Sequence, residues 1–332
     1  MRFVLRAEAL DGDDALLTLI DRLVDRAADE VHRVEVPDAD LLQDSRWYQT
    51  ARPTRRKVLT SAVASPPRQR AASRGPHAKH EDVRTLDDAT RADKLAHTAL
   101  IVLVEDREAD GVLLDILVEE LGSPELAALW ARGKTVTPRA VELDSAGGIT
   151  AMPQRIQRAV DDANSEGRPV RLFVLCDSDV RWPGDTQSEN PVQAVFDTCT
   201  EHGIPHHVLQ KRNAENYIPD EVFEAVRDDL RRVNDVDRFN ALLRRSRAQR
   251  DHFPVKDGMK PSERDGAIAA GLYDTSEQGD LALLEERLLP KRPRPMLLLY
   301  TERRAAFTAA GLSARAGNDE IDKLLAALAG EL

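Results

Sequence analysis

The sequence predicts an α/β protein built around a mainly parallel β-sheet. Two strongly apolar stretches, residues 98–104 and 170–176, each end in acidic residues, and amphipathic helical patterns follow them. Stretches rich in Val, Ile and Leu are typical of strands that helices cover on both faces. The alternation of strands and helices favours right-handed crossovers, and therefore parallel strands.

Composition limits the classes of protein to consider. The chain has 332 residues, 42% of them hydrophobic and 4% aromatic, which suits two or three structural units. It contains no apolar run long enough to span a bilayer, and the N-terminus lacks the pattern of a signal peptide. We therefore expect a cytoplasmic protein without membrane association. Cys176 and Cys199 are too few for a disulfide framework, and Cys176 is expected to be a buried strand residue.

The N-terminal region, residues 1–95, is predicted to be a small α/β unit with a basic segment. A strand over 2–9 precedes an amphipathic helix over 13–31. Residues 46–79 then carry Lys and Arg without Asp or Glu, together with Trp47 and Tyr48. Two interpretations remain open for this segment: a phosphate-binding surface on which the aromatic pair stacks, or a solvated linker with a loop over 65–80. The net charge of −11 argues against uniform coating of nucleic acid.

The central region, residues 96–218, repeats strand and helix after a short helix over 86–96. Hydrophobic periodicity predicts its elements in this order: strand 98–104, helix 107–121, strand 139–143, helix 150–165, strand 170–176, helix 191–202 and strand 206–210. The remaining residues, 219–332, are expected to be mostly helical, with one strand over 296–300. A final amphipathic helix over 318–328 is expected to cover the sheet or to form a homo-oligomer interface.

Acidic residues follow two of the predicted central strands. Glu105 comes directly after the first strand, and Asp177 and Asp179 come after the third. Open α/β sheets bind ligands beyond the carboxyl ends of their strands, so these acids can converge on one site. In an extended segment, residues two apart project to the same side. Because clustered carboxylates repel one another, we expect Mg²⁺ or Mn²⁺ to bind there.

The order of these and other motifs resembles the TOPRIM domain of type IA and type II topoisomerases, bacterial primases and OLD-family nucleases. The resemblance covers about residues 97–260 and is closest to OLD-type and related stand-alone TOPRIM nucleases. Its motifs are Glu105, Asp177-Ser-Asp179, Gly147-Gly148, Glu215-Asn216-Tyr217 and Val255-Lys256-Asp-Gly258. It implies a Rossmann-like TOPRIM fold, with an N-terminal α/β and a C-terminal helical appendage, and a metal-dependent endonuclease that uses two ions.

The resemblance also implies roles for single residues. Glu105, Asp177 and Asp179 are expected to bind the first ion, and Glu105 is the alternative general base. The family usually has an acid four positions after this glutamate, whereas this chain has Glu108 and Asp110 at three and five. The ligands of the second ion therefore remain open between Glu108, Asp110 and Asp144.

Two more residues complete the candidate catalytic set. Lys256 is expected to offset charge on the pentavalent phosphate, and Glu215 to contact metal or phosphate. Structural explanations stand beside these roles. Acids are favoured at a helix start, Asp144 suits an Asx turn, and residues 215–219 suit a strand-to-helix junction. His206 and His207 are expected to be structural.

The resemblance further implies partners. Nucleic acid is the expected substrate, with DNA favoured over RNA. Because the chain has no Walker A sequence, a separate ATPase or sensor subunit is expected, as in the nuclease effectors of anti-phage defence.

Two alternatives remain. The stretch 99–122 also resembles the start of a response-regulator receiver, with Asp144 as the nearest phospho-acceptor, although no strand-end lysine follows at the required spacing. A catalytically inactive nucleic-acid-binding subunit is the other alternative.

Overall fold

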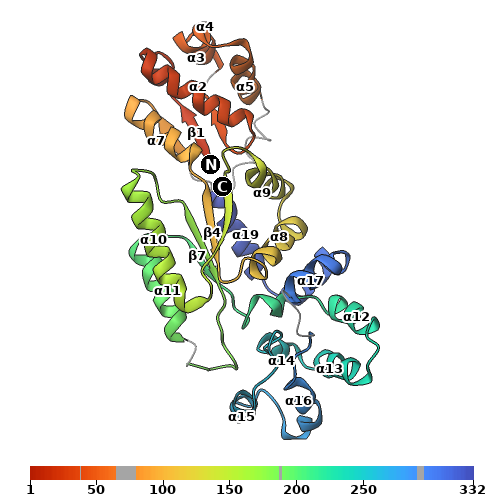
Figure 1. Ribbon diagram of the computed structural model, residues 1–332. Helices are drawn as coiled ribbons and strands as arrows, with labels where there is room; N and C mark the ends of the chain where they lie inside the picture. Colours follow the sequence, from red (N-terminus) through yellow and green to blue (C-terminus); the bar gives the residue numbers. More distant parts are fainter. Residues whose placement is uncertain (38, 65–79, 187–188, 290–294) are drawn as a thin grey trace.

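Two parallel sheets organise the chain in the computed structural model, which describes residues 1–37, 39–64, 80–186, 189–289 and 295–332 (Figure 1). The N-terminal sheet has the order β2-β1-β3, with β1 at Arg2–Leu5, β2 at Arg33–Glu35 and β3 at His80–Val83. The central sheet has the order β5-β4-β6-β7, with β4 at Leu100–Val104, β5 at Val141–Ser145, β6 at Leu172–Cys176 and β7 at His206–Val208. The predicted α/β class with parallel strands is confirmed.

The N-terminal unit packs its helices around the smaller sheet. These are α1 (Ala7–Leu10), α2 (Asp14–Ala28), α3 (Ala39–Asp44), α4 (Arg46–Thr50), α5 (Pro53–Ala64) and α7 (Leu86–His97). The predicted helix over 13–31 is confirmed as α2, which Asp13 caps by accepting the Leu16 backbone N–H at 2.9 Å. The strand predicted over 2–9 ends at Leu5, because α1 begins two residues later.

Two residues of the described basic segment have partners within the N-terminal unit. Trp47 is 1% exposed, and its indole N–H donates to Asp21 at 2.9 Å, so the prediction that it stacks on a base is wrong. Arg55 forms ion pairs with Asp21 and Asp25. Residues 46–64 therefore fold as α4 and α5 against the acidic face of α2, rather than as a linker. The loop predicted over 65–80 lies, apart from its last residue, outside the described residues.

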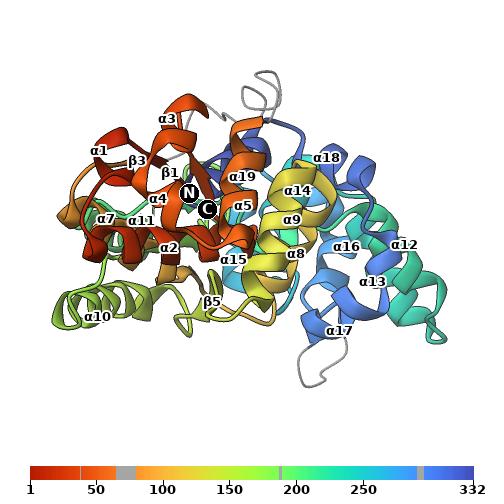
Figure 2. The same cartoon turned by 90° about the horizontal axis from the view of Figure 1, so that it is seen from above.

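The central sheet lies between two helical layers (Figures 1 and 2). One layer contains α8 (Asp110–Leu121) and α9 (Pro124–Thr135), and the other α10 (Met152–Ser165) and α11 (Glu189–Glu201). Side chains alternate between them: Val102 and Phe173 pack on the α8 side, whereas Leu103 and Val174 pack on the α10 side. Burial on both faces explains why β4 and β6 are apolar throughout. Cys176 is buried, as predicted.

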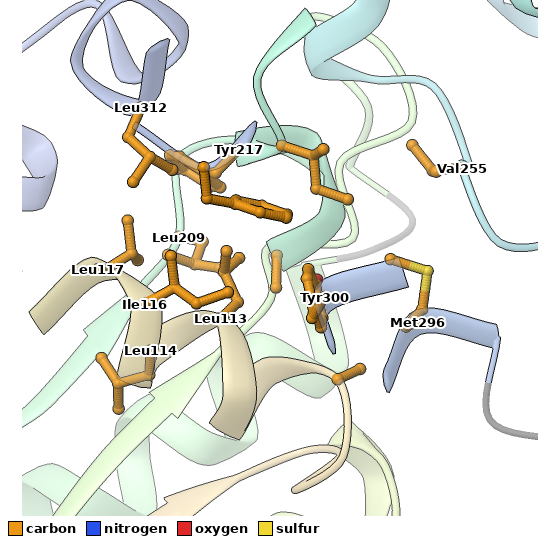
Figure 3. Packing of buried hydrophobic residues seen from close by; sticks show 14 of the residues in the cluster. Leu113, Leu114, Ile116, Leu117, Leu209, Tyr217, Val255, Met296, Tyr300 and Leu312 are labelled. Atoms are coloured by element: carbon orange, nitrogen blue, oxygen red, sulfur yellow. The ribbon is translucent and has the colours of Figure 1, made fainter. Parts of the chain in front are cut away.

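The C-terminal region is helical and shares its core with the α8 side of the sheet. It contains the 3-10 helix η2 (Ala214–Tyr217) and helices α12 (Asp220–Asp228), α13 (Val233–Leu243), α14 (Arg247–Asp251), α15 (Pro261–Ala269), α16 (Gln278–Leu284), α17 (Pro295–Glu302), α18 (Ala309–Ala316) and α19 (Glu320–Glu331). Figure 3 shows Tyr217, Leu312 and Tyr300 packing around the α8 residues Leu113 and Ile116.

The strand predicted over 296–300 is wrong, because this run forms α17. Its buried residues Met296, Leu299 and Tyr300 are three and four positions apart, as on one face of a helix. A short apolar run does not distinguish a buried strand from a buried helix by periodicity alone. The helix predicted over 318–328 is confirmed as α19. Among the described residues, no helix has the length and apolarity to cross a bilayer.

A buried carboxylate fixes α19 to the sheet. Glu320 is fully buried and accepts hydrogen bonds from the backbone N–H of Gln210 (2.6 Å) and the hydroxyl of Tyr217 (2.5 Å). Burial alone would raise the pKa of Glu320, but its bonds to His207, Tyr217 and Gln210 hold that pKa below its usual value. The charged form of Glu320 therefore stabilises the junction of β7, η2 and α19.

We expect Glu320→Ala to lower the free energy of unfolding by about 3 kcal/mol, because it leaves the buried Tyr217 hydroxyl without an acceptor and the Gln210 N–H without its present partner. Denaturant unfolding measures this loss. Asp322→Ala, which changes an exposed carboxylate on the same helix, should change the value by no more than about 0.5 kcal/mol. Equal effects of the two substitutions would contradict the assigned role of Glu320.

Candidate functional site

The candidate site lies at the carboxyl ends of β4 and β6, which are neighbours in the centre of the sheet. The chain leaves β4 towards β5 on one side, and β6 towards β7 on the other. Strand order reverses at such a point, and open α/β sheets form their ligand crevice there. Glu105 directly follows β4 and Asp177 directly follows β6, so each flanks the reversal.

The structure brings Glu105 and Asp177 into contact, although they are 72 positions apart in the chain. The backbone N–H of Asp177 donates to the Glu105 carboxylate at 3.0 Å. The Asp177 side chain is buried and accepts from the backbone N–H of Ala214 at 2.9 Å and from the amide of Asn213 at 3.0 Å. The predicted convergence of these two acids on one site is therefore present.

Asn213 connects Asp177 with Asp179. Its Nδ2 also donates to Oδ1 of Asp179 at 3.1 Å. Asp179 has φ = 53°, in the left-handed region that is uncommon for a non-glycine residue. The segment is thus not extended as expected, yet both carboxylates reach the same amide. Sequence analysis missed Asn213; the available signal was a polar residue just beyond the fourth strand.

Asp110 belongs to the same group of acids. It begins α8 and is 5% exposed; its Oδ2 accepts the backbone N–H of Asp106 at 2.8 Å. Its other oxygen, Oδ1, is buried without a hydrogen-bond partner among the described residues. The hydroxyl of Tyr300, also buried, is without a hydrogen-bond partner there too. The site therefore contains buried polar atoms with unused bonding capacity.

Glu215 and Lys256 form an ion pair beside Asp110. Glu215 is 2% exposed, and the Lys256 ammonium contacts its carboxylate. The structural explanation of residues 215–217 also holds: Asn216 caps η2, and Tyr217 is buried in the core. Glu215 thus faces the acids, while its two neighbours support the fold. We call Glu105, Asp110, Asp177, Asp179 and Glu215 the acid cluster.

Burial and mutual repulsion raise the pKa values of the acid cluster. Burial, followed by the charges of Asp179 and Asp110, raises the pKa of Glu105 to about 7. Burial and the charge of Glu215 raise the pKa of Asp110 to about 7, and burial with the neighbouring acids raises that of Asp177. Burial disfavours the charged form of Lys256, but Glu215 and Asp110 outweigh it and raise its pKa.

Two candidates stand apart from this group. Asp144 lies in β5, which is an edge strand of the central sheet. Arg155 donates to its carboxylate from Nε at 3.0 Å and from Nη2 at 2.5 Å. Glu108 lies in the turn before α8, where its backbone N–H donates to Asp106 at 2.9 Å. Within the described part of the chain, no three His, Cys, Asp or Glu side chains are arranged to hold one metal ion as they stand. Carboxylate rotation would have to precede metal binding.

Comparisons with protein-family models, with curated proteins and with solved structures gave no match for this chain. The TOPRIM resemblance thus depends on the motifs and their placement.

The raised pKa values predict how stability depends on pH without metal. Between about pH 4.5 and 7, the folded protein keeps protons on Glu105 and Asp110 that the unfolded chain has lost. Their stabilisation is complete below the unfolded pKa values and is lost as pH rises through about 7. Glu105→Gln and Asp110→Asn should each reduce this loss by up to about 1.4 kcal/mol per pH unit.

Urea unfolding from pH 5 to 7.5 in metal-free buffer measures this dependence. Glu142→Gln is the control, because Glu142 is an exposed residue of β5. If all variants keep the wild-type slope, the two carboxyls do not hold these protons.

Proposed function

We propose that this chain is a metal-dependent nuclease of the TOPRIM type, which hydrolyses phosphodiester bonds at the acid cluster. One observation carries the proposal: Glu105 and Asp177, from distant strands, meet at the reversal of strand order with further carboxylates around them. Acids that are gathered and buried together are costly unless cations compensate them. Lys256 supplies one positive charge, fewer than the five carboxylates of the cluster.

The side chains of the acid cluster offer the type of ligand atom that Mg²⁺ or Mn²⁺ binds. Both ions prefer oxygen ligands, and the cluster offers carboxylates, one of which has an unpartnered buried oxygen, Asp110 Oδ1. Glu105, Asp177 and Asp179 would hold one ion, and Asp110 with Glu215 would contribute to a second. Bound ions would activate water and stabilise the leaving oxygen. Asp110 replaces Glu108 and Asp144 as the preferred ligand, because it lies inside the cluster.

The chain's own residues have distinct parts in this proposal. Asn213 and the backbone N–H of Ala214 orient Asp177, and the Asp177 N–H orients Glu105. Glu105 is the candidate acceptor of the water proton. Lys256, released from Glu215 by an incoming phosphate, would offset the charge that develops on the phosphoryl oxygens.

The wider context remains part of the proposal. Nucleic acid, with DNA favoured, is the substrate, and a separate ATPase or sensor subunit would control an antiviral effector of this kind. The receiver alternative is weaker because Arg155 occupies Asp144, its phospho-acceptor. The inactive-subunit alternative is separated by the next experiment.

Purified chain should nick supercoiled plasmid in Mg²⁺ or Mn²⁺, and a parallel reaction with transfer RNA tests the other substrate class. Glu105→Gln and Asp177→Asn should reduce the cleavage rate on the order of 100-fold or more, because each removes charge stabilisation at the reacting group. Glu142→Gln should cleave like wild type. Metal binding without cleavage of either nucleic acid would favour the inactive subunit.

Metal should also stabilise the folded chain independently of activity. At about 100 times the dissociation constant, Mn²⁺ should add about 2.7 kcal/mol to the free energy of unfolding. Thermal unfolding with and without Mn²⁺ measures the effect, which Asp177→Asn and Asp110→Asn should diminish. A Mn²⁺ effect of the same size in both variants would remove the acid cluster as the metal site.

A further inference from the structure

A second charged site lies away from the acid cluster, between α12, α14 and α18. It is a cavity of about 120 Å³. Three arginines contribute to its wall: Arg247 and Arg250 from α14, and Arg315 from α18. The remaining wall residues are Asp220, Glu221, Gly311 and Ala314. We call this cavity the arginine pocket.

Most carboxylates around the arginine pocket already have partners. Asp220 pairs with Arg250, and Asp251, behind the pocket, pairs with Lys211 at 2.5 Å and with Arg315. Arg247 is different. Its guanidinium donates to the backbone carbonyl of Arg315 at 3.0 Å, and it has no carboxylate partner among the described residues. Together with Lys211, the three arginines are four cations, and they face three carboxylates, those of Asp220, Glu221 and Asp251, so one positive charge is in excess.

Burial, followed by neighbouring cations, disfavours the charged forms of Lys211 and Arg315. Burial and the charge of Arg315 lower the pKa of Lys211 to about 8. Burial also lowers the pKa of Arg315, and the Arg250 charge acts in the same direction. In addition, Nε of Arg250 is buried without a hydrogen-bond partner among the described residues. An anion in the pocket would stabilise the charged forms of the buried cations and could accept a hydrogen bond from Nε of Arg250.

The Arg247 guanidinium lies against the backbone of a glycine. Gly317 ends α18 with φ = 72°, and a Cβ atom there would lie 1.4 Å from Nη2 of Arg247. Only glycine leaves room for the guanidinium and adopts this backbone conformation without strain. The hydrogen bond to the Arg315 carbonyl places the Arg247 guanidinium beside the pocket before any ligand binds, which reduces the entropic cost of binding.

We propose that the arginine pocket binds a phosphate group carried by a ligand. Guanidinium groups match phosphate oxygens through paired N–H donors. A volume of about 120 Å³ corresponds to about four water molecules, enough for one phosphate group but not for a whole nucleotide. The rest of the ligand would extend to solvent past the exposed Glu221.

A smaller void, of about 10 Å³, is lined by Arg250 and Arg315 of the arginine pocket and by Glu215 of the acid cluster. The Asn216 side chain, next to Glu215, donates to the backbone carbonyl of Arg250 at 2.7 Å. A ligand that moves Arg250 would act on the segment that carries Glu215. If the nuclease proposal holds, the phosphate belongs either to a nucleic-acid end or to a free nucleotide.

Calorimetric titration of the full, metal-free chain tests this proposal. The probes are inorganic phosphate, AMP, and one short DNA strand with either a 5′-phosphate or a 5′-hydroxyl. We expect phosphate, AMP and the 5′-phosphorylated strand to bind. Arg247→Gln should weaken each about tenfold, or about 1.4 kcal/mol. Arg247→Lys, which keeps the charge without the paired donors, should weaken them less.

Arg244→Gln is the matched control. It removes the same charge three positions earlier, from an exposed side chain that pairs with Asp280 outside the pocket, and should bind like wild type. Tighter binding of the phosphorylated strand than of AMP identifies a nucleic-acid end, and equal binding identifies a free nucleotide. Absence of binding by all probes, or equal weakening in Arg244→Gln and Arg247→Gln, overturns the proposal. Because no divalent metal is present, these outcomes do not depend on nuclease activity.

Discussion

The structure depends on how it accommodates several largely buried carboxylates near the carboxyl ends of β4 and β6. Glu105, Asp110, Asp177 and Glu215 are brought together by elements from three parts of the chain, and burial, followed by their mutual repulsion, raises the pKa values of the first three. The Lys256 ammonium, the Asn213 amide and backbone N–H groups oppose that repulsion. A fold optimised for stability alone would not gather these charges, which supports the proposal of a cationic ligand.

The 3-10 helix η2 connects the acid cluster to the rest of the C-terminal region. Its four residues include Glu215, which faces Lys256. They also include Asn216, whose side-chain amide donates to the backbone carbonyls of Arg250 and Phe253. Tyr217 binds the buried Glu320 of α19. One short segment therefore joins the acid cluster, the arginine pocket and the terminal helix.

The N-terminal unit shows how misleading a local charge run can be. Residues 46–64 look like a basic linker, yet Arg55 neutralises Asp21 and Asp25 of α2, and Trp47 is core. After folding, Arg46 and Arg55 of the basic part form ion pairs with aspartates of the acidic part. A junction is formed where Arg26 of α2 donates to the carbonyls of Ala96 (3.0 Å) and Pro138 (2.6 Å), which connects the two units.

The sequence by itself determined the alternation of strands and helices, and the placement of Glu105 and Asp177 at strand ends, because hydrophobic periodicity and burial on both faces leave a local record. It could not determine partners that are distant in the chain. Only the tertiary structure decided that Asp144 binds Arg155, that Asp110 joins the acid cluster, and that the apolar run over 296–300 forms a helix. The physical reason is that ion pairing, burial and strand order depend on which segments meet in space, and periodicity does not encode that.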